Sequence, residues 1–320
     1  MDRFVELGVL PVRHKSARGY RPHLSLMFNP GSPRTFSIDS TLAGGSDAYL
    51  VTHAHSDHYG SSVMRSEKSV CSSQTAAALE IIHGKRYCGR VFETGSSIDI
   101  YGVTVKTFTT AHTPGAAAFY WENEVGTRIL VTGDIKDAGA LPQCDVLVTE
   151  ASYGDPDDPA CHFTDDLDGF REAISDDAAF GAYTFGKAQR AVGLLRAGGY
   201  CDKVHMDRTS LELTRRLMSD VEPLDGLGDG LCIVPPGELS ALPHRSKYVL
   251  TARRDYPFRK INISDHMDVN GLVDMVKKCS PEAVLVYHPK GTRARKFASH
   301  LNRTGTFALS LEDIPTIMPG

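Results

Sequence analysis

The segment that most constrains the fold of this 320-residue chain is the hexapeptide His-Ala-His-Ser-Asp-His at residues 53–58. It places three imidazoles and a carboxylate directly after the strand-like run Ala48–Thr52. Neutral imidazole and carboxylate are ligands of borderline divalent ions, above all zinc. Because side chains alternate along a strand, an extended chain cannot aim all four groups at one ion, whereas a loop curled around two ions can use them all. A solvated, histidine-rich loop is the alternative interpretation.

Single residues of the metal-binding type also follow three later strand-like runs. These runs and residues are Thr104–Phe108 with His112, Arg128–Thr132 with Asp134, and Ala283–Tyr287 with His288. Alone, a histidine at a strand end is more often a hydrogen-bonded surface residue. The repetition of one arrangement favours a common site at the carboxyl ends of the strands, where sheet-based folds build their sites.

The order of these residues resembles the metallo-β-lactamase superfamily, whose signature is a His-x-His-x-Asp-His loop followed by a histidine and a bridging aspartate. Asp39, after the strand-like run Thr35–Ile38, is similar to that family's first motif, a carboxylate that orients the ligands. The resemblance implies two zinc ions, with Mn²⁺ as an alternative in one site. It assigns the ligands as follows: His53, His55 and His112 to the first ion, Asp57, His58 and His288 to the second, and Asp134 to both.

The type and order of two further residues resemble motifs of the β-CASP branch of this superfamily. This branch is a group of nucleases that includes Artemis-like, crosslink-repair and ligase-associated enzymes. Leu147–Thr149 is a strand-like run before Glu150, and Ile261–Asp265 is a second one before His266. With His288 they match the branch's acid, histidine, histidine order. The resemblance implies that Glu150 and His266 are catalytic, together with Asp57 and Asp39. A structural ion pair between Glu150 and His266 at a domain seam is the alternative.

The expected fold is α/β, a four-layer αβ/βα metallo-β-lactamase sandwich with a small inserted α/β lid, the β-CASP domain. The resemblance divides the chain into residues 1–154, the insertion 155–258, and residues 259–320, which return to the first domain with two strands. In the first part, Ser73–Ile82 is predicted to be a helix with Ser73 as its N-cap.

The insertion is predicted to alternate strands and helices, which favours a mostly parallel sheet. Its expected helices are Asp165–Ser175, Lys187–Ala197 and Thr209–Met218. Its expected strands lie near Phe180–Thr184, Lys203–Met206, Leu231–Val234 and Lys247–Ala252. After the insertion, helices are expected over Asn270–Lys278 and Thr292–Leu301.

Two features indicate where a phosphate backbone would bind. Gly186 and Lys187 open a helix, and backbone N–H groups at a helix start attract anions. The chain carries a net charge of −4, but residues 245–303 hold thirteen basic and five acidic residues, a local balance of +8. Such a patch binds phosphates whatever the global sign. The candidate contacts are Gly186, Lys187, Arg253, Arg254 and Lys290; a plain helix start and a solvated basic face are the alternatives.

Seven scattered cysteines without a Cys-x-x-Cys pair indicate reduced thiols in the cytoplasm, or in the nucleus of a eukaryote. No signal-like start and no apolar run of membrane-spanning length are present, so no membrane association is expected.

These patterns predict a metal-dependent nuclease that hydrolyses phosphodiester bonds, as an exonuclease in DNA repair or processing. A histidine at position 288 is typical of RNA enzymes in the branch, whereas the short insertion and the Gly-Lys segment resemble its DNA-repair members. We favour DNA over RNA. An RNA-processing nuclease, a small-molecule hydrolase such as a thioesterase, and an inactive binding scaffold are the alternatives.

Overall fold

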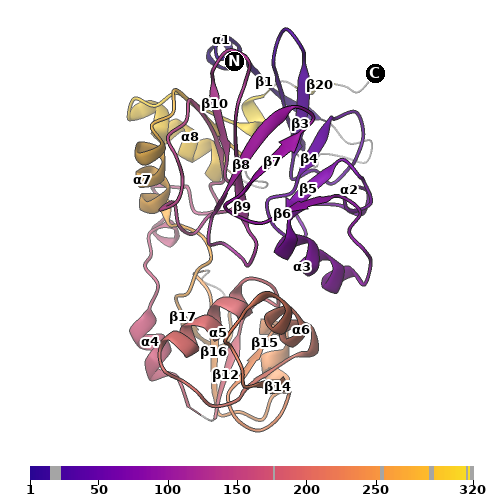
Figure 1. Cartoon of the computed structure of the whole chain (residues 1–320). Helices are drawn as coiled ribbons and strands as arrows, with labels where there is room; N and C mark the ends of the chain where they lie inside the picture. The colour runs from indigo at the N-terminus through magenta and orange to yellow at the C-terminus, as the bar shows by residue number, and fades with distance from the viewer. Residues whose placement is uncertain (15–22, 176, 253–255, 288–291, 315, 318–320) are drawn as a thin grey trace.

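Three β-sheets organise the computed structural model, which describes residues 1–14, 23–175, 177–252, 256–287, 292–314 and 316–317. Two seven-stranded sheets form the upper part of the molecule in Figure 1, and a six-stranded sheet forms a lobe below them. The chain is therefore α/β, as predicted, with a larger body and a smaller lobe.

The first sheet of the body contains most of the amino-terminal strands. In order across the sheet they are β20 (Thr316–Ile317), β1 (Val9–His14), β2 (His23–Phe28), β3 (Arg34–Ile38), β4 (Ala48–Leu50), β5 (Ser69–Ser72) and β6 (Arg90–Phe92). Strands β1, β2 and β3 are antiparallel neighbours, and from β3 to β6 the neighbours are parallel.

The second sheet of the body packs against the first. Its strands are β19 (Ala308–Ser310), β18 (Ala283–Val286), β11 (Val146–Thr149), β10 (Arg128–Val131), β9 (Ala117–Glu122), β8 (Val103–Thr109) and β7 (Ser97–Ile100). A buried apolar cluster fills the space between the sheets. At its centre the Trp121 ring of the second sheet lies 5.6 Å from Phe28 and 5.5 Å from Phe36 of the first. Burial of these large rings supplies much of the stabilisation of the body.

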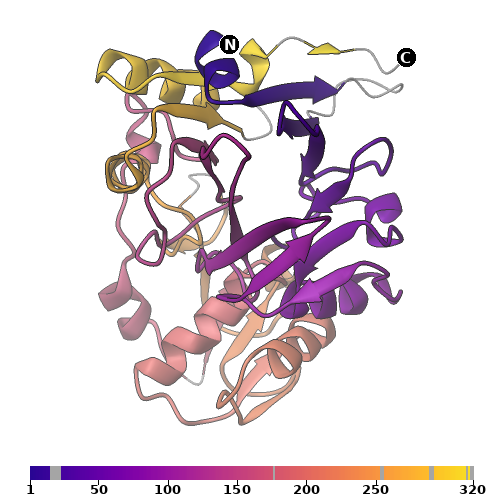
Figure 2. The same cartoon turned by 45° about the horizontal axis from the view of Figure 1, so that its top comes forward.

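Helices cover the outer faces of the two sheets, on opposite sides of the body (Figure 2). Against the first sheet lie α2 (Ser61–Met64) and α3 (Ser73–His83), and against the second α7 (Val269–Cys279) and α8 (Arg293–Arg303). The short elements α1 (Asp2–Glu6), η1 (Pro159–Cys161) and η3 (Leu311–Asp313) complete the body. These layers agree with an α/β sandwich.

The lobe is built on the third sheet. Its strands, in order, are β14 (Leu224–Gly226), β13 (Val204–Met206), β15 (Cys232–Val234), β12 (Ala178–Gly181), β16 (Ser246–Leu250) and β17 (Arg259–Ile261). All pairings between them are parallel, which confirms the predicted parallel sheet. The other elements of the lobe are α4 (Leu167–Glu172), α5 (Lys187–Ala197), α6 (Arg208–Leu217) and η2 (Pro236–Ala241).

The last strand of the lobe corrects two expectations. Residues from Lys260 onward were expected in the body, but β17 pairs with β16 in the third sheet. The strand also ends at Ile261, so residues 262–266 are not a strand. The backbone there bonds to loop groups instead, since Asn262 O accepts from Asp166 N at 2.7 Å and Ser264 N donates to Asp165 Oδ1 at 3.0 Å.

Helix boundaries follow the predictions closely, with one wrong cap. The α5 helix has the predicted limits, whereas the N-cap of α3 is Ser72 and not Ser73, because the Ser72 hydroxyl accepts from Thr75 N at 3.0 Å. The predicted helix over Asp165–Ser175 is shorter, since Asp166 caps α4 and the helix ends at Glu172.

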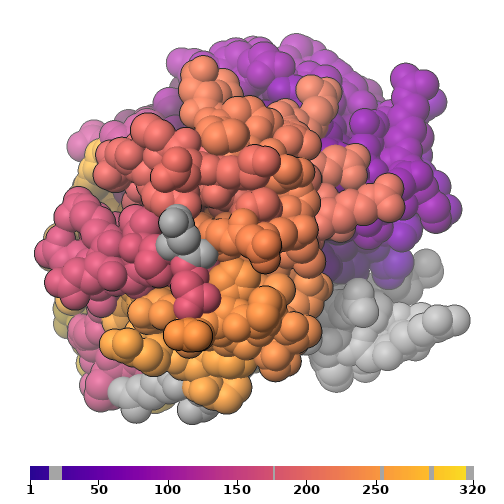
Figure 3. All heavy atoms as spheres, turned by 90° about the horizontal axis from the view of Figure 1, so that it is seen from below, coloured from indigo at the N-terminus to yellow at the C-terminus, as the bar shows by residue number. Residues whose placement is uncertain are grey.

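The lobe is held against the body through α3 and α6. Phe185, Leu213 and Leu217 of the lobe belong to the same buried apolar cluster as α3, and Gln74 Nε2 donates to Leu217 O at 3.0 Å. Seen from the end opposite to both termini, atoms of the lobe cover most of that face (Figure 3). Among the described residues no helix is both long and apolar enough to span a membrane.

Candidate metal centre

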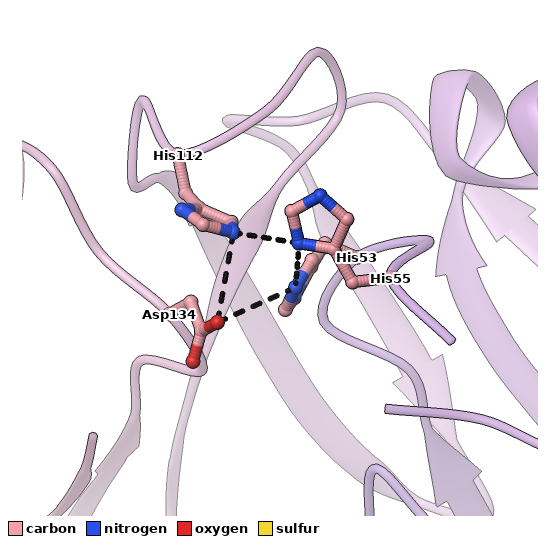
Figure 4. A group of neighbouring side chains, drawn as sticks. All are labelled: His53, His55, His112 and Asp134. Carbon is pink, nitrogen blue, oxygen red and sulfur yellow. Dashed lines mark hydrogen bonds and ion pairs between the residues drawn. The ribbon is translucent and has the colours of Figure 1, made fainter. Parts of the chain in front are cut away.

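Four side chains converge on one point: His53, His55, His112 and Asp134 (Figure 4). His55 Nδ1 lies 3.1 Å from His53 Nε2 and 3.0 Å from His112 Nε2. Asp134 Oδ2 lies 3.6 Å from His53 Nε2 and 3.6 Å from His112 Nε2. One donor atom from each residue lies within 4.8 Å of the other three, so together they surround a space of the size of one ion.

Loops at the ends of three strands bring these side chains together. His53 follows β4 of the first sheet, His112 follows β8, and Asp134 follows β10 of the second sheet. Because the two sheets face each other, these loops meet at one edge of the sandwich. The strand-end rule used on the sequence therefore places the residues correctly relative to one another.

Two backbone positions are specialised for this convergence. Gly133, with φ +62°, approaches Thr52 so closely that a Cβ would lie 2.4 Å from the Thr52 hydroxyl oxygen. Ala111, before His112, has φ +53°, a left-handed conformation uncommon for a residue with a side chain. Such conformations persist only where the surrounding structure enforces them, and they are concentrated at functional sites.

The three histidines of the cluster are held in the neutral form that binds metals. Burial is the largest effect, and the pKa values of His53 and His112 lie well below the ordinary value for histidine. Burial also lowers the pKa of His55. His112 Nδ1 lies 2.8 Å from Asp265 O; since a carbonyl only accepts, Nδ1 carries the hydrogen and Nε2 presents its lone pair to the cluster.

Asp39 orients a fourth imidazole, that of His58. Its carboxylate accepts hydrogen bonds from Thr52 N at 2.8 Å, Thr52 Oγ1 at 2.9 Å and the Tyr287 hydroxyl at 3.0 Å. His58 Nδ1 lies 2.8 Å from Asp39 Oδ2, and His58 Nε2 then faces Asp134 Oδ2 at 3.4 Å. Burial alone would lower the pKa of His58, but Asp134 and Asp39 together raise it well above its ordinary value.

The geometry and chemistry of the cluster fit a divalent ion. A tetrahedral zinc with Zn–N bonds of about 2.0–2.1 Å separates its ligand atoms by about 3.3 Å. The observed separations of 3.0, 3.1 and 3.6 Å bracket that value. Asp134 Oδ1 is buried and makes no hydrogen bond to any described residue, a costly state that a cation would relieve.

Glu150 and His266 form a second functional unit beside the cluster. His266 Nδ1 lies 2.9 Å from both carboxylate oxygens of Glu150, which also accept from Ile135 N at 2.7 Å and Ser152 N at 3.3 Å. Burial would lower the pKa of His266, but Glu150 raises it to about 9. The His266 ring lies 4.6 Å from that of His112, so the Glu150–His266 pair adjoins the cluster.

A cavity of about 560 Å³ lies over the cluster, between the body and the lobe. Its walls carry metal-type, basic and aromatic side chains from both parts. The lining residues are His55, Ser56, Asp57, Asp134, Ser152, Tyr153, Tyr183, Thr184, Phe185, Lys187, Thr251, Ser264, Asp265, His266 and Arg293. A substrate in this cavity would contact both the cluster and His266.

The lobe side of the cavity is formed by the start of α5. Gly186, with φ +86°, leaves no room for a side chain, because a Cβ would lie 2.8 Å from Thr113 Cγ2. The Lys187 ammonium is buried, donates to Ile263 O at 2.9 Å and lies 3.2 Å from Asp265 Oδ2. The positive charge predicted to grip phosphate is therefore already balanced by Asp265.

The remaining predicted residues are less informative. Asp57 is half exposed and lines the cavity, with Oδ1 4.0 Å from His58 Nε2. Four predicted residues lie outside the described residues: His288, Lys290, Arg253 and Arg254. Of the basic cluster in α8, Arg293 pairs with Asp158 at 2.9 Å and Lys296 with Asp155 at 2.6 Å.

Three residues of the site were not predicted from the sequence: Asp265, Tyr287 and Tyr183. Asp265 immediately precedes His266, and Tyr287 immediately precedes the predicted ligand His288, so adjacency to a predicted residue was the available signal. Tyr183 carried no such signal beyond its place before the Gly-Lys segment.

No family model matches the chain. It is 30% identical over 121 residues to a metal-dependent hydrolase of Xanthobacter autotrophicus, covering 33% of the chain and 49% of that protein. It is 28% identical over 137 residues to the DNA cross-link repair protein pso2/snm1 of Schizosaccharomyces pombe, covering 40% of the chain and 24% of that protein. A "Probable DNA ligase" of Opitutus terrae is 25% identical over 298 residues, covering 82% of the chain and 28% of that protein.

The chain thus spans about half the length of the first relative and about a quarter of each of the other two. Among solved structures, a protein of unknown function from Enterococcus faecalis superposes with a TM-score of 0.64 over 98% of both chains at 11% identity. That likeness shows a shared fold.

Proposed function

We propose that this chain is a zinc-dependent nuclease of the metallo-β-lactamase superfamily, in its β-CASP branch, and that it hydrolyses phosphodiester bonds of nucleic acid. One observation carries the proposal: a single cavity is lined by His55 and Asp134 of the four-residue cluster and by His266, which is hydrogen-bonded to Glu150. The named relatives, a metal-dependent hydrolase and a DNA cross-link repair protein, support the same chemistry.

In this proposal two zinc ions occupy the centre, with Mn²⁺ as an alternative in one site. His53, His55 and His112 would hold the first; Asp57, His58 and His288 the second; and Asp134 would contact both. Bound zinc would polarise a phosphoryl oxygen and lower the pKa of a coordinated water to about 7. Asp39 would position the second site, since it fixes both the His58 ring and the backbone of Thr52.

His266 would supply the leaving-group proton. Its raised pKa, about 9, leaves it protonated at neutral pH, and Glu150 occupies Nδ1, so Nε2 is the nitrogen left to donate. Donation to the leaving oxygen would let that oxygen depart without developing a full negative charge. Two backbone N–H groups, of Ile135 and Ser152, hold the Glu150 carboxylate in position.

The substrate we propose is DNA, attacked from an end. The lobe, residues 155–258 together with β17, would be the β-CASP insertion and would form the wall opposite the metal centre. Gly186 and Lys187 would contact a phosphate there, and Lys290, Arg253 and Arg254 would contact more of the backbone. The Opitutus terrae and Schizosaccharomyces pombe relatives, with DNA in their names, favour DNA over RNA.

The test uses four end-labelled single-stranded oligonucleotides, DNA and RNA, each with and without a 5′-phosphate, and protein loaded with zinc. We expect a ladder of mononucleotide steps from the DNA substrates and none with Asp134→Asn. Asp274→Asn, an exposed carboxylate on α7, is the matched control and should behave as wild type. Intact substrates throughout would overturn the nuclease proposal, and cleavage of RNA alone would overturn the choice of DNA.

A further inference from the structure

The aromatic side chains that line the cavity differ sharply in exposure. Tyr153 is 8% exposed and Phe185 5%, whereas Tyr183 is 43% exposed. Tyr153 is covered by the Arg293 guanidinium, 5.5 Å from its ring centroid, and by Phe163 at 4.7 Å. Tyr183 is thus the aromatic ring of the described cavity wall that offers a large surface to an occupant.

The position of the Tyr183 ring is fixed. Its hydroxyl lies 2.9 Å from that of Tyr256, which packs against the apolar cluster around Leu239 on the η2 side of the lobe. This contact satisfies the polar end of the side chain and restricts its rotation. With the hydroxyl paired, the aromatic ring is the group that Tyr183 can offer to an occupant, and it favours a planar apolar partner over a charged one.

Tyr183 also stands close to the metal centre. It lies in the connection from β12 to α5, two residues before Phe185, whose carbonyl oxygen is 3.2 Å from His55 Nε2. Two residues span at most about 7 Å of chain. The backbone of Tyr183 is therefore close to that of Phe185, and its side chain lines the same cavity as His55 of the cluster.

We propose that Tyr183 stacks on an unpaired nucleobase of the nucleotide next to the bond that is cleaved. This inference rests on the proposed nuclease function and names its substrate class more closely, as single-stranded ends. Base–aromatic stacking tolerates every base, because each has a π face, but a base inside a duplex is already stacked and paired. Tyr183 therefore makes the enzyme select strands that are open at the end.

Binding of an oligonucleotide with a terminal 2-aminopurine, measured with metal-free protein, tests the stacking without relying on activity. Stacking quenches the fluorescence of this base, so wild type and Tyr183→Phe should both quench it. Tyr183→Leu should lose the quenching and bind about 5- to 150-fold more weakly, the range for one base–aromatic stack. Tyr101→Leu, which changes an equally exposed tyrosine between β7 and β8, is the control and should match wild type.

A terminal abasic nucleotide separates base stacking from contacts to sugar and phosphate. Wild type and Tyr183→Leu should bind this probe equally, because it has no base to stack. Equal quenching and equal affinity of the two proteins for the 2-aminopurine strand would overturn the role of Tyr183, even where wild type cleaves DNA. Failure of wild type to cleave any nucleic acid would instead overturn the proposed function itself.

Discussion

The two walls of the cavity are built on opposite electrostatic principles. On the body side, three neutral imidazoles and the Asp134 carboxylate crowd together, and His58, whose pKa Asp134 and Asp39 raise, lies 3.4 Å from Asp134 Oδ2. Asp134 Oδ1 makes no hydrogen bond to a described residue. On the lobe side, the charge that lines the cavity is paired, since the Lys187 ammonium lies 3.2 Å from Asp265 Oδ2. Outside the cavity lining, Arg190 pairs with Asp165 at 2.6 Å. The body wall therefore gathers neutral lone pairs around one carboxylate, whereas the lobe wall holds a buried ammonium beside its counter-ion. Asp265 Oδ1, like Asp134 Oδ1, makes no hydrogen bond to a described residue.

This difference indicates that the body wall provides the metal-binding groups, whereas the lobe wall provides a rigid surface. Buried lone pairs that point at one another are unfavourable unless a cation binds between them, so the body wall is organised for metal binding. Paired charges hold a wall in place and lend it rigidity, at a cost in desolvation. We therefore expect substitutions on the body wall to change catalysis strongly, and substitutions on the lobe wall to change mainly stability and substrate preference.

The largest effect is expected from Asp134→Asn, because it removes the negative charge that faces every imidazole of the cluster. The proposed nuclease activity should fall by more than the about 10²–10⁴-fold expected from loss of a single positioned proton donor. Metal analysis should show fewer zinc ions than the about two per chain expected for a dinuclear site. A variant that keeps both its zinc and its rate would show that the body wall is complete without metal, and the contrast between the walls would fail.

A smaller loss of activity is expected from His266→Ala, which removes the proposed proton donor and leaves the four-residue cluster intact. The rate should decrease by about 10²–10⁴-fold, the usual contribution of a positioned general acid. Zinc content should stay at the wild-type level, because in this proposal zinc is held by His53, His55, His112 and Asp134 and not by the second group of metal-type side chains, Asp134, Glu150 and His266. Zinc depletion in this variant would place His266 among the metal ligands and contradict its assigned role.

Asp39→Asn should lower zinc affinity moderately, because Asp39 contacts the proposed ligand His58 but is not one of the four residues of the cluster. The amide can keep part of the hydrogen bonding to Thr52, but it is a weaker acceptor than the carboxylate for the His58 Nδ1–H that orients the ring. Loss of an orienting carboxylate lowers metal affinity by about 10–100-fold. Zinc titration against a fluorescent chelator measures this directly. An affinity equal to wild type would show that the cluster holds its geometry without Asp39.

The positions of the side chains on the body wall could be predicted well from the sequence, because each is marked by the short apolar run before it. Each ligand follows an apolar strand, and β4, β8, β10 and β11 lie where the apolar runs were found. The weak points were short strands with few apolar residues: β17 begins with Arg259 and Lys260, and β14 is Leu-Asp-Gly. Neither carries the alternation or the apolar run that identifies a strand.

The lobe wall could not be predicted because its pairings are not local. The Lys187 ammonium donates to the carbonyl oxygen of Ile263, which lies 76 residues further along the chain. It also pairs with Asp265, two residues beyond Ile263, and the sequence has no signal for either contact. The Gly-Lys segment alone predicts an anion site. Only the structure shows a buried carboxylate beside the lysine, which changes the expected consequence of removing that charge.

The smallest effect on rate is expected from Lys187→Met on the lobe wall. It leaves the Asp265 carboxylate buried without its cation, so the free energy of unfolding should fall by about 3 kcal/mol, measured by urea denaturation. A second substitution, Asp265→Leu, should restore part of this loss, because the unpaired charge is then gone. Because Lys187 shares its charge with Asp265, the wild-type preference for 5′-phosphorylated over 5′-hydroxyl DNA ends should be less than about tenfold, or about 1.4 kcal/mol. In Lys187→Met this preference should disappear.

Arg190→Met is the matched control for this prediction. Arg190 lies on the same helix, pairs with Asp165 and is absent from the cavity lining, so its loss should lower stability without changing end preference. If Lys187→Met behaves as Arg190→Met does, Lys187 has a purely structural role and the lobe wall binds substrate through Tyr183 and the α5 backbone alone. If Lys187→Met instead lowers the rate as far as His266→Ala, catalysis is shared by both walls and the division between them is wrong.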